Sequence, residues 1–322
     1  QAVCDYLCTF WLLSSCKYMR SIGKLFLNQD QKAVLEAFQE SDAIFVKGGG
    51  FIHSFGSITD MYFSYYLLFH IRLALALGKK VYILPNSVGP LNNPISKRMT
   101  IKTLRRCALV SVREKISLDF LTSLGVDAKY YPDFGFYLRS SQKDFTGYLV
   151  DHGVPMNQKK VVITLRPNRF TGMENAHQLY LNYLEGACRL VDYLVTRGYH
   201  VTFFAHTLGP SSHEDDRIAI KDVRNKLTPD VLCKTSYIED FDLTCEDVEK
   251  IYSYYDYMVG TRFHSVIFSL NVGTPALAIA YGGNKGKGIM AVLDNSCYSI
   301  DMDKIIGDNL IKKFKMLESD IK

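Results

Sequence analysis

The stretch YMVGTRFHSVIFSL, from Tyr257 to Leu270, joins a short apolar run to the start of a helix. The run ends at Gly260 and predicts a buried strand. The residues that follow have the spacing of one buried helical face: Phe263, Val266, Ile267 and Leu270. A strand, a tight turn and a helix in this order are typical of an α/β protein.

Two basic side chains fall in the first turn of this helix. Thr261 is the predicted N-cap, so Arg262 and His264 lie among the free N–H groups. The helix dipole makes that end positive, and each cation there costs about 0.3–1 kcal/mol. A phosphate or carboxylate bound at this turn would offset the cost. The alternative is that Arg262 pairs with an acid of the chain and that His264 caps a neighbouring group.

The same strand, turn and helix pattern recurs along most of the chain. Apolar runs such as KVYILP, VVITLRP and HVTFFAHT alternate with longer helical stretches, which predicts βαβ units and parallel sheets. A polar segment, residues 139–159, is the expected linker. We therefore expect two Rossmann-like domains, residues 1–150 and residues 151–322.

Ligands of such sheets bind outside the carboxyl ends of the strands. Arginine, histidine and lysine are in excess at these positions, which indicates an anionic ligand. In the first half the strand-end residues are Gly48, Gly49, Gly50, His53, Asn86, Ser87, Arg113, Glu114 and Asp133. In the second half they are Arg166, His206, Arg262, His264, Tyr281 and Lys285.

Two further motifs have a structural as well as a functional interpretation. The triple glycine after AIFVK is expected to form a turn that lets backbone approach a ligand. It is not the GxGxxG pattern of a dinucleotide site. The acids of SSHEDDR, from Ser211 to Arg217, would form a metal site only if their carboxylates converge. Otherwise they are acids at a helix N-terminus, where the helix dipole favours negative charge. We expect no metal and no cofactor.

Composition limits the class of protein. Hydrophobic residues make up 48% and charged residues 22% of the 322 residues, as in globular proteins. The net charge of +5 is spread along the chain, which does not indicate a nucleic-acid partner but fits small anions or an anionic membrane surface. The most apolar run, residues 65–78, contains His70 and Arg72 and is too short to cross a membrane.

Cysteine usage indicates the compartment. The eight cysteines include no CxxC pair, and we expect buried thiols in a reducing environment. The protein is therefore expected in the cytoplasm. The basic stretch from Asn93 to Arg106 has two interpretations, a solvated helix face or a peripheral contact with the inner face of the cell membrane. The sequence leaves the oligomeric state open, with a homo-oligomer among the alternatives.

Taken together and in order, several segments resemble the polysaccharide pyruvyl transferases. These segments are SDAIFVKGGGFIH, GKKVYILPNSVGPL, VSVREKISLDFLTSLGV, YPDFGFYL, VVITLRP and GTRFHSVIFSLNVGTPALAIAYGGNKGKGIM. The resemblance implies a GT-B-like fold, in which two Rossmann-like domains face a central cleft. Nothing in the chain matches the Asn-x-Gly-Asp loop with which the family opens, so we expect the first domain to be truncated at its start.

The resemblance also implies an activity. Family members transfer a pyruvyl group from phosphoenolpyruvate to two hydroxyls of one sugar, which gives a cyclic ketal and phosphate. The acceptor is expected to be a sugar of a surface polysaccharide or of its lipid-linked precursor. The alternative is a nucleotide-sugar-dependent glycosyltransferase of the same architecture, whose diphosphate would use the Arg-x-His helix.

The resemblance and the strand-end positions together assign roles to residues. The second domain is expected to bind the donor, through Arg166, Thr261, Arg262, His264, Tyr281 and Lys285. The first domain is expected to bind the acceptor, through Gly48, Gly49, Gly50, His53, Asn86 and Ser87. Histidine is a residue suited to general acid–base work, and His264 stands beside the predicted anion site. Arg262 is expected to act in catalysis as well as in donor binding. Glu114 is the expected partner base, with Asp133 as an alternative and an Arg113–Glu114 ion pair as the structural explanation.

Overall fold

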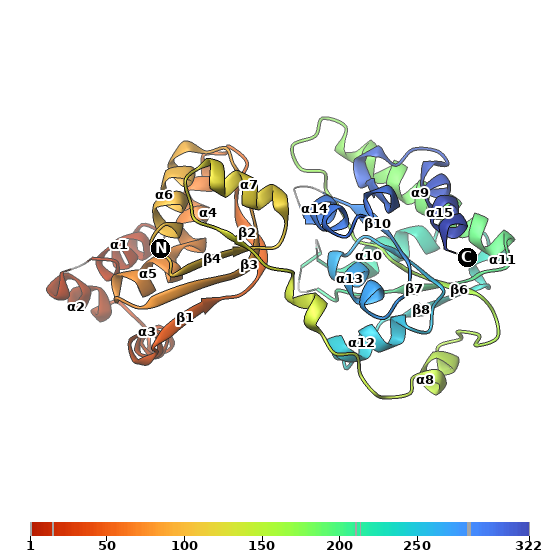
Figure 1. Cartoon of the computed structure of the whole chain (residues 1–322), viewed down its shortest axis with the longest axis horizontal. Coiled ribbons are helices and arrows are strands. Elements are labelled where there is room, and N and C mark those ends of the chain that lie inside the picture. The colour runs from red at the N-terminus through yellow and green to blue at the C-terminus, as the bar shows by residue number, and fades with distance from the viewer. Residues whose placement is uncertain (1, 15, 210, 213, 282–284, 322) are drawn as a thin grey trace. The chain divides into compact units, whose positions relative to one another are not determined.

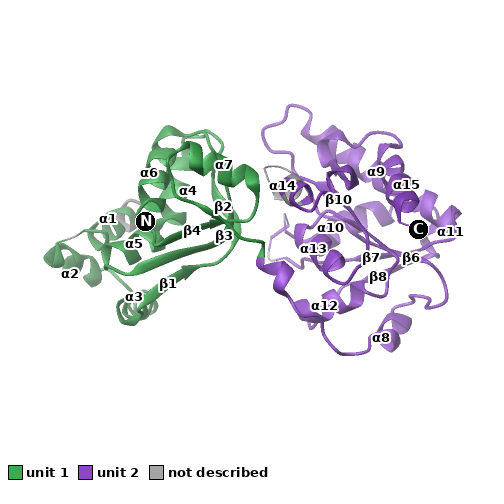
Figure 2. Ribbon diagram, in the orientation of Figure 1, with its two compact units in different colours: residues 1–133 green, residues 134–322 purple. Residues whose placement is uncertain are grey.

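The chain forms two compact α/β units. The computed structural model describes residues 2–14, 16–209, 211–212, 214–281 and 285–321. The units are Gln1–Asp133 and Phe134–Lys322 (Figure 2). The division falls before the predicted boundary at residue 150, because the segment after Asp133 packs on the second unit. The Ser141 N–H donates to the Glu246 carbonyl (3.0 Å), and the Phe145 N–H donates to the Tyr254 hydroxyl (3.1 Å).

The first unit has a parallel sheet with the strand order β1-β3-β4-β5, and β2 also pairs with β3 (Figure 1). Its strands are β1 (Ala43–Val46), β2 (Gly49–Ser54), β3 (Lys80–Leu91), β4 (Leu109–Val112) and β5 (Lys129–Tyr130). Its helices are α1 (Ala2–Leu12), α2 (Lys17–Leu25), α3 (Gln29–Glu40), α4 (Thr59–Leu67), α5 (Phe69–Ala76), α6 (Pro94–Leu104) and α7 (Lys115–Ser123).

The predicted turn of this unit, at the triple glycine, is the start of a strand. The segment NSVGP continues strand β3, and the triple glycine leads into β2 beside it. A Cβ atom on Gly48 would lie 2.6 Å from the Pro85 carbonyl oxygen, so the glycine allows the two backbones to approach. The prediction of a turn was wrong because glycine serves close strand packing here, a use that the sequence alone does not distinguish from a turn.

The second unit has a six-stranded parallel sheet with the order β11-β10-β9-β6-β7-β8. Its strands are β6 (Lys160–Thr164), β7 (His200–Phe204), β8 (Thr235–Ile238), β9 (Tyr257–Gly260), β10 (Ala276–Ala280) and β11 (Ser299–Asp301). Its helices are α8 (Thr146–Asp151), α9 (Ala176–Thr196), α10 (Asp216–Arg224), α11 (Pro229–Leu232), α12 (Cys245–Tyr252), α13 (Phe263–Asn271), α14 (Lys285–Val292) and α15 (Asn309–Asp320).

Helices cover both faces of this sheet, so its central strand is apolar on both sides. Val161 and Ile163 of β6 belong to the core beneath α9, α10 and α15. Val162, which points the other way, packs with residues of α12 and α13. A strand buried on both faces reads as a continuous apolar run, as β6 does. The first strand of the unit, β6, lies between β7 and β9, so the strand order reverses at the β6–β9 pair. Such a pair is where doubly wound sheets bind ligands.

Two expectations of the sequence analysis concern the whole chain. Among the described helices, none has the length and apolar character needed to cross a bilayer. The expectation of buried thiols was wrong for at least four cysteines, because Cys16, Cys233, Cys245 and Cys297 are exposed.

Gly260 sets the distance between strand β9 and helix α13. A Cβ atom at this position would lie 2.7 Å from Cγ2 of Val266 and 2.9 Å from Oγ of Ser265. We expect Gly260→Ala to lower the free energy of unfolding by about 1–3 kcal/mol, because the helix must shift outward. Gly147→Ala, in helix α8 with open space around the new methyl group, is the control and should be neutral or stabilising. Equal urea midpoints for Gly260→Ala and the wild type would contradict this packing.

Candidate functional site

The pair of strands at which the order reverses ends at two arginines. Thr164 of β6 and Gly260 of β9 are register partners, and Arg166 and Arg262 follow them by two residues. Thr261 is not the N-cap of α13, as the sequence predicted. Its N–H and its hydroxyl both donate to the Thr164 carbonyl, at 3.1 and 3.0 Å, so it ties the two strand ends together. Arg262 is the N-cap residue, and its side chain makes no capping hydrogen bond.

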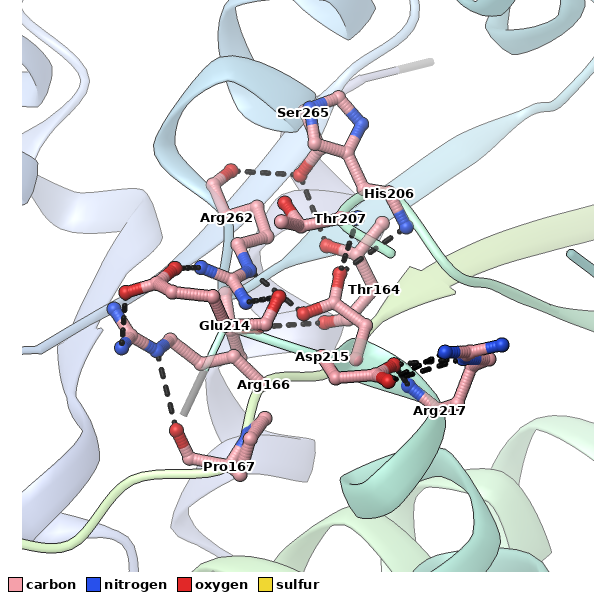
Figure 3. A network of polar contacts seen from close by, with 12 residues as sticks. Thr164, Arg166, Pro167, His206, Thr207, Glu214, Asp215, Arg217, Arg262 and Ser265 are labelled. Carbon is pink, nitrogen blue, oxygen red and sulfur yellow. Dashed lines mark hydrogen bonds and ion pairs between the residues drawn. The ribbon is translucent and has the colours of Figure 1, made fainter. Parts of the chain in front are cut away.

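The Arg262 guanidinium is buried and bound to two acids. Its Nε donates to Oδ1 of Asp216 (2.7 Å), and its NH1 nitrogen donates to Oε2 of Glu214 (2.7 Å). Its NH2 nitrogen donates to the Glu214 carbonyl oxygen (2.9 Å). These contacts are drawn in Figure 3. The sequence analysis gave pairing with an acid of the chain as the alternative for Arg262. The structure shows this pairing, with Asp216 and Glu214.

Asp216 is the fixed member of this cluster. Its side chain is 0% exposed, and Oδ2 accepts the N–H groups of His206 (3.1 Å) and Thr207 (3.0 Å). Burial raises the pKa of Asp216 to about 6, and the Arg262 guanidinium opposes the shift. With one guanidinium and two N–H donors, the carboxylate is fully bonded and holds the ends of β7, α10 and β9 together.

Arg166 reaches the same cluster from β6. Its NH2 nitrogen lies 3.7 Å from Oε1 of Glu214, and its Cζ atom lies 3.7 Å from the centre of the Tyr281 ring. Tyr281 follows β10, the strand beside β9. The structure thus brings together three of the predicted donor residues, Arg166, Arg262 and Tyr281. Lys285 begins helix α14, and its side chain lies outside the part of the chain whose side chains are described.

His264 is exposed in the first turn of α13, one turn from Phe268. A second histidine, His206, lies nearby at the end of β7. Its Nδ1 shares a hydrogen bond with the Tyr252 hydroxyl (2.9 Å), and its ring lies against Phe268. Burial lowers the pKa of His206 to about 3, and the charges of His264 and Arg262 act in the same direction. His206 is therefore neutral at physiological pH, while the ring of His264 is exposed to solvent.

The first unit has a buried polar cluster that joins the end of β4 to Ser87 within β3. Arg113 forms an ion pair with Asp133, and its Nε donates to the Ser87 hydroxyl (2.9 Å). The sequence analysis expected Arg113 to pair with Glu114, whereas the ion pair in the structure is with Asp133. The Glu114 side chain is 0% exposed and accepts a hydrogen bond from Ser117. Because it is buried, we assign Glu114 no catalytic step.

The predicted acceptor residues fall into two groups. Asn86 and Ser87 are buried, and the Asn86 amide donates to the Lys47 carbonyl (3.0 Å), so both organise the backbone around them. Gly48, Gly49, Gly50 and His53 are partly exposed, and the His53 Nδ1 atom bonds to the Gly50 carbonyl (3.0 Å). Only this second group offers a surface to a ligand.

Sequence reasoning missed the acids that bind the arginines. Glu214 and Asp216 belong to the run SSHEDDR, which was assigned to a helix dipole or to a metal. Asp216 does begin helix α10, yet its carboxylate binds Arg262, 46 residues away. The available signal was that this run follows β7, which neighbours β6 in a doubly wound sheet.

The buried Glu114 predicts a pH-dependent stability. Burial raises its pKa from 4.5 to about 7, against the hydrogen bond from Ser117. Because the folded-state pKa exceeds the unfolded-state value, the stability present at low pH is lost as the pH rises toward 7 and above. We expect Glu114→Gln to gain stability over the wild type between about pH 5 and pH 8, by up to about 3 kcal/mol. The exposed Glu36→Gln controls for net charge, and a pH-independent difference for Glu114→Gln would contradict a buried neutral carboxyl.

Comparison with solved structures identifies the fold. A putative UDP-N-acetylglucosamine 2-epimerase from Listeria monocytogenes matches with a TM-score of 0.53 at 13% identity, over 89% of this chain and 70% of that chain. The ADP-heptose LPS heptosyltransferase II of E. coli matches with a TM-score of 0.51 at 8% identity, over 90% of this chain and 81% of that chain. These matches confirm the predicted fold class, two Rossmann-like units of GT-B type. At such low identity they show the fold alone.

Comparison with known sequences identifies the family. The amylovoran biosynthesis protein AmsJ of Erwinia amylovora is 27% identical over 297 residues. That match covers 86% of this chain and 66% of AmsJ, so the chain spans slightly less than two thirds of its relative. The family profile described as polysaccharide pyruvyl transferase matches residues 4–283, which is most of the chain. The chain therefore belongs to the polysaccharide pyruvyl transferase family.

Proposed function

We propose that the protein transfers a pyruvyl group from phosphoenolpyruvate to two hydroxyls of a saccharide, and that the second unit binds the donor. The observation that carries the proposal is the convergence of Arg166 and Arg262 on one carboxylate, that of Glu214. Two guanidiniums at the strand pair where the order reverses form a site that already holds a carboxyl group. Phosphoenolpyruvate has a carboxylate and a phosphate on one small carbon skeleton.

The chemistry requires proton transfers beside this site. Protonation of the methylene carbon makes the adjacent carbon electrophilic, and the first sugar hydroxyl adds there and loses its proton. The second hydroxyl then attacks the same carbon, the C–O bond to phosphate breaks, and the ketal ring closes. The proton of this hydroxyl is taken up by the departing phosphate. His264 is the group proposed to move these protons, because it is exposed and follows Arg262 by two residues. Arg262 and Arg166 would stabilise the leaving phosphate.

The acceptor is proposed to bind the first unit around Gly48–Gly50 and His53. This part of the carboxyl edge is partly exposed. A sugar of a surface polysaccharide or of its lipid-linked precursor is the proposed acceptor, and the support is the family and the similarity to AmsJ, an amylovoran biosynthesis protein. The donor and the reaction do not require a resident metal or cofactor in this scheme.

Two variants test the assigned roles, with ketal formation followed by mass spectrometry of an undecaprenyl-linked glycan. His264→Gln should lower kcat about 100-fold or more and leave donor binding unchanged, since it removes an acid–base group from an exposed position. Arg166→Gln should raise the KM for phosphoenolpyruvate. Arg262→Ala is a poor probe, because it would leave the Asp216 carboxylate buried without its ion pair.

Two results would contradict the proposal. If a nucleotide sugar, and not phosphoenolpyruvate, raises the melting temperature of the wild type and is turned over, the protein is a glycosyltransferase. If His264→Gln retains the wild-type kcat, His264 moves no proton in the rate-limiting step.

A lipid-linked acceptor would bring the protein to an anionic membrane, and we propose that helix α6 and the loop beside its start make this contact. Arg98 and Lys102 are exposed on α6, and the helix has no acidic residue. Ile95 is 57% exposed, and the neighbouring loop exposes Phe55 (66%) and Ile58 (87%). The loop is tied to the helix, because the Asn93 amide donates to the Ser57 carbonyl (3.1 Å). Apolar tips beside cations are the composition of interfacial contacts.

Sedimentation with vesicles tests this contact. Arg98→Gln/Lys102→Gln should weaken binding to phosphatidylglycerol vesicles by about 30-fold, at about 1 kcal/mol for each cation. The matched control is Lys221→Gln/Lys226→Gln in the second unit, which removes the same charge from exposed positions. Equal losses in the two double variants, or equal binding to phosphatidylcholine, would contradict a specific surface.

A further inference from the structure

Glu214 differs from Asp216 in exposure and in the number of groups that hold its carboxylate. The Glu214 side chain is 48% exposed, whereas those of Arg262 and Arg166 are 7% and 11% exposed. Its two carboxylate oxygens are divided between the two arginines, Oε2 at 2.7 Å from Arg262 and Oε1 at 3.7 Å from Arg166. Figure 3 shows Glu214 between them. A carboxylate of the chain thus bridges the two cations proposed to bind the donor.

The two acids hold Arg262 with different strength. Asp216 is fully buried and bonded by three donors, so its removal would leave the guanidinium without a buried counter-charge. Glu214 pairs from the solvent side, where ion pairs contribute about 0–1 kcal/mol. A ligand can therefore replace the Glu214 carboxylate while Asp216 keeps the guanidinium in place.

We propose that Glu214 is an exchangeable counter-anion, which holds Arg166 and Arg262 in position until a donor anion takes its place. This inference rests on the proposed function for the identity of the donor, and on the geometry alone for the exchange. The incoming group is a carboxylate or phosphate that accepts from Arg262 through NH1 and from Arg166. No covalent bond changes, and the Glu214 side chain turns into solvent.

The arrangement makes Glu214 a residue that sets donor affinity. Every anion that uses both arginines must first break the two Glu214 contacts, so the cost enters each dissociation constant equally. In the absence of ligand the same contacts place one negative charge between two buried cations and stabilise the unit. Removing the charge should therefore have opposite effects on the free protein and on ligand affinity, which a purely structural ion pair would not produce.

The test compares the wild type with Glu214→Gln, a change that keeps the size of the side chain. Dissociation constants are measured by calorimetry for phosphoenolpyruvate and for inorganic phosphate. We expect both ligands to bind the variant about 2- to 10-fold more tightly, because the competing charge is absent. The ligand-free variant should melt below the wild type, and saturating phosphate should raise its melting temperature more.

Glu185→Gln is the matched control. Glu185 is 62% exposed and pairs with Arg189 at 2.9 Å, so it tests the loss of an exposed glutamate whose ion pair is with a different arginine. This variant should bind both ligands with wild-type affinity. A gain in affinity equal to that of Glu214→Gln would attribute the effect to net charge and overturn the proposal.

The remaining outcomes separate this inference from the proposed function. If phosphoenolpyruvate binds the wild type and Glu214→Gln equally, the exchange is wrong and the donor site stands. If phosphate binds the variant more tightly and phosphoenolpyruvate binds neither protein, the exchange stands and the proposed donor is wrong. If neither anion binds either protein, both ideas are overturned.

Discussion

The contact between Arg262 and Asp216 is the interaction on which the arrangement of the second unit's strand ends depends. One buried carboxylate accepts from the guanidinium and from the backbone N–H groups of His206 and Thr207. It therefore joins the residues that follow β7 to the residues that follow β9, across the intervening strand β6. Because a buried ion pair is costly to break on one side only, this contact fixes where the Arg262 guanidinium lies. The exposed groups, Glu214 and His264, are placed around that fixed cation.

Asp216, in the first turn of helix α10, offsets the unfavourable positive charge of Arg262 at the start of α13. Arg262 turns away from the N–H groups of its own helix toward Asp216, which lies in the first turn of α10. An acid at that position is favourable for α10, and it pairs with the cation that is unfavourable for α13. The unit thus pairs a favourable acid at one helix start with an unfavourable cation at another. The exposed side of the guanidinium is then bound by Glu214, which is the place we propose for the donor anion.

The fold was largely predictable from the sequence, and the partners within the site were not. Apolar runs such as that of β6, separated by helices, predicted two parallel α/β units, because strand burial and connection rules act locally. The strand-end rule also found Arg166, Arg262 and Tyr281, which the structure brings together. The carboxylates of Glu214 and Asp216 were missed since contacts over 46 or more residues depend on strand order. The burial of Glu114 was not foreseen, because burial cannot be read from a polar residue at a strand end.

In the proposed mechanism the guanidiniums of Arg166 and Arg262 bind the donor in place of an internal carboxylate. The most direct measurement is a crystal structure of the protein with phosphoenolpyruvate bound. We expect a donor carboxylate or phosphate oxygen to lie within hydrogen-bond distance of both arginines. The Arg262–Asp216 contact should remain intact, and the Glu214 side chain should turn away. A structure in which Glu214 remains between the arginines while phosphoenolpyruvate binds at another place would contradict it.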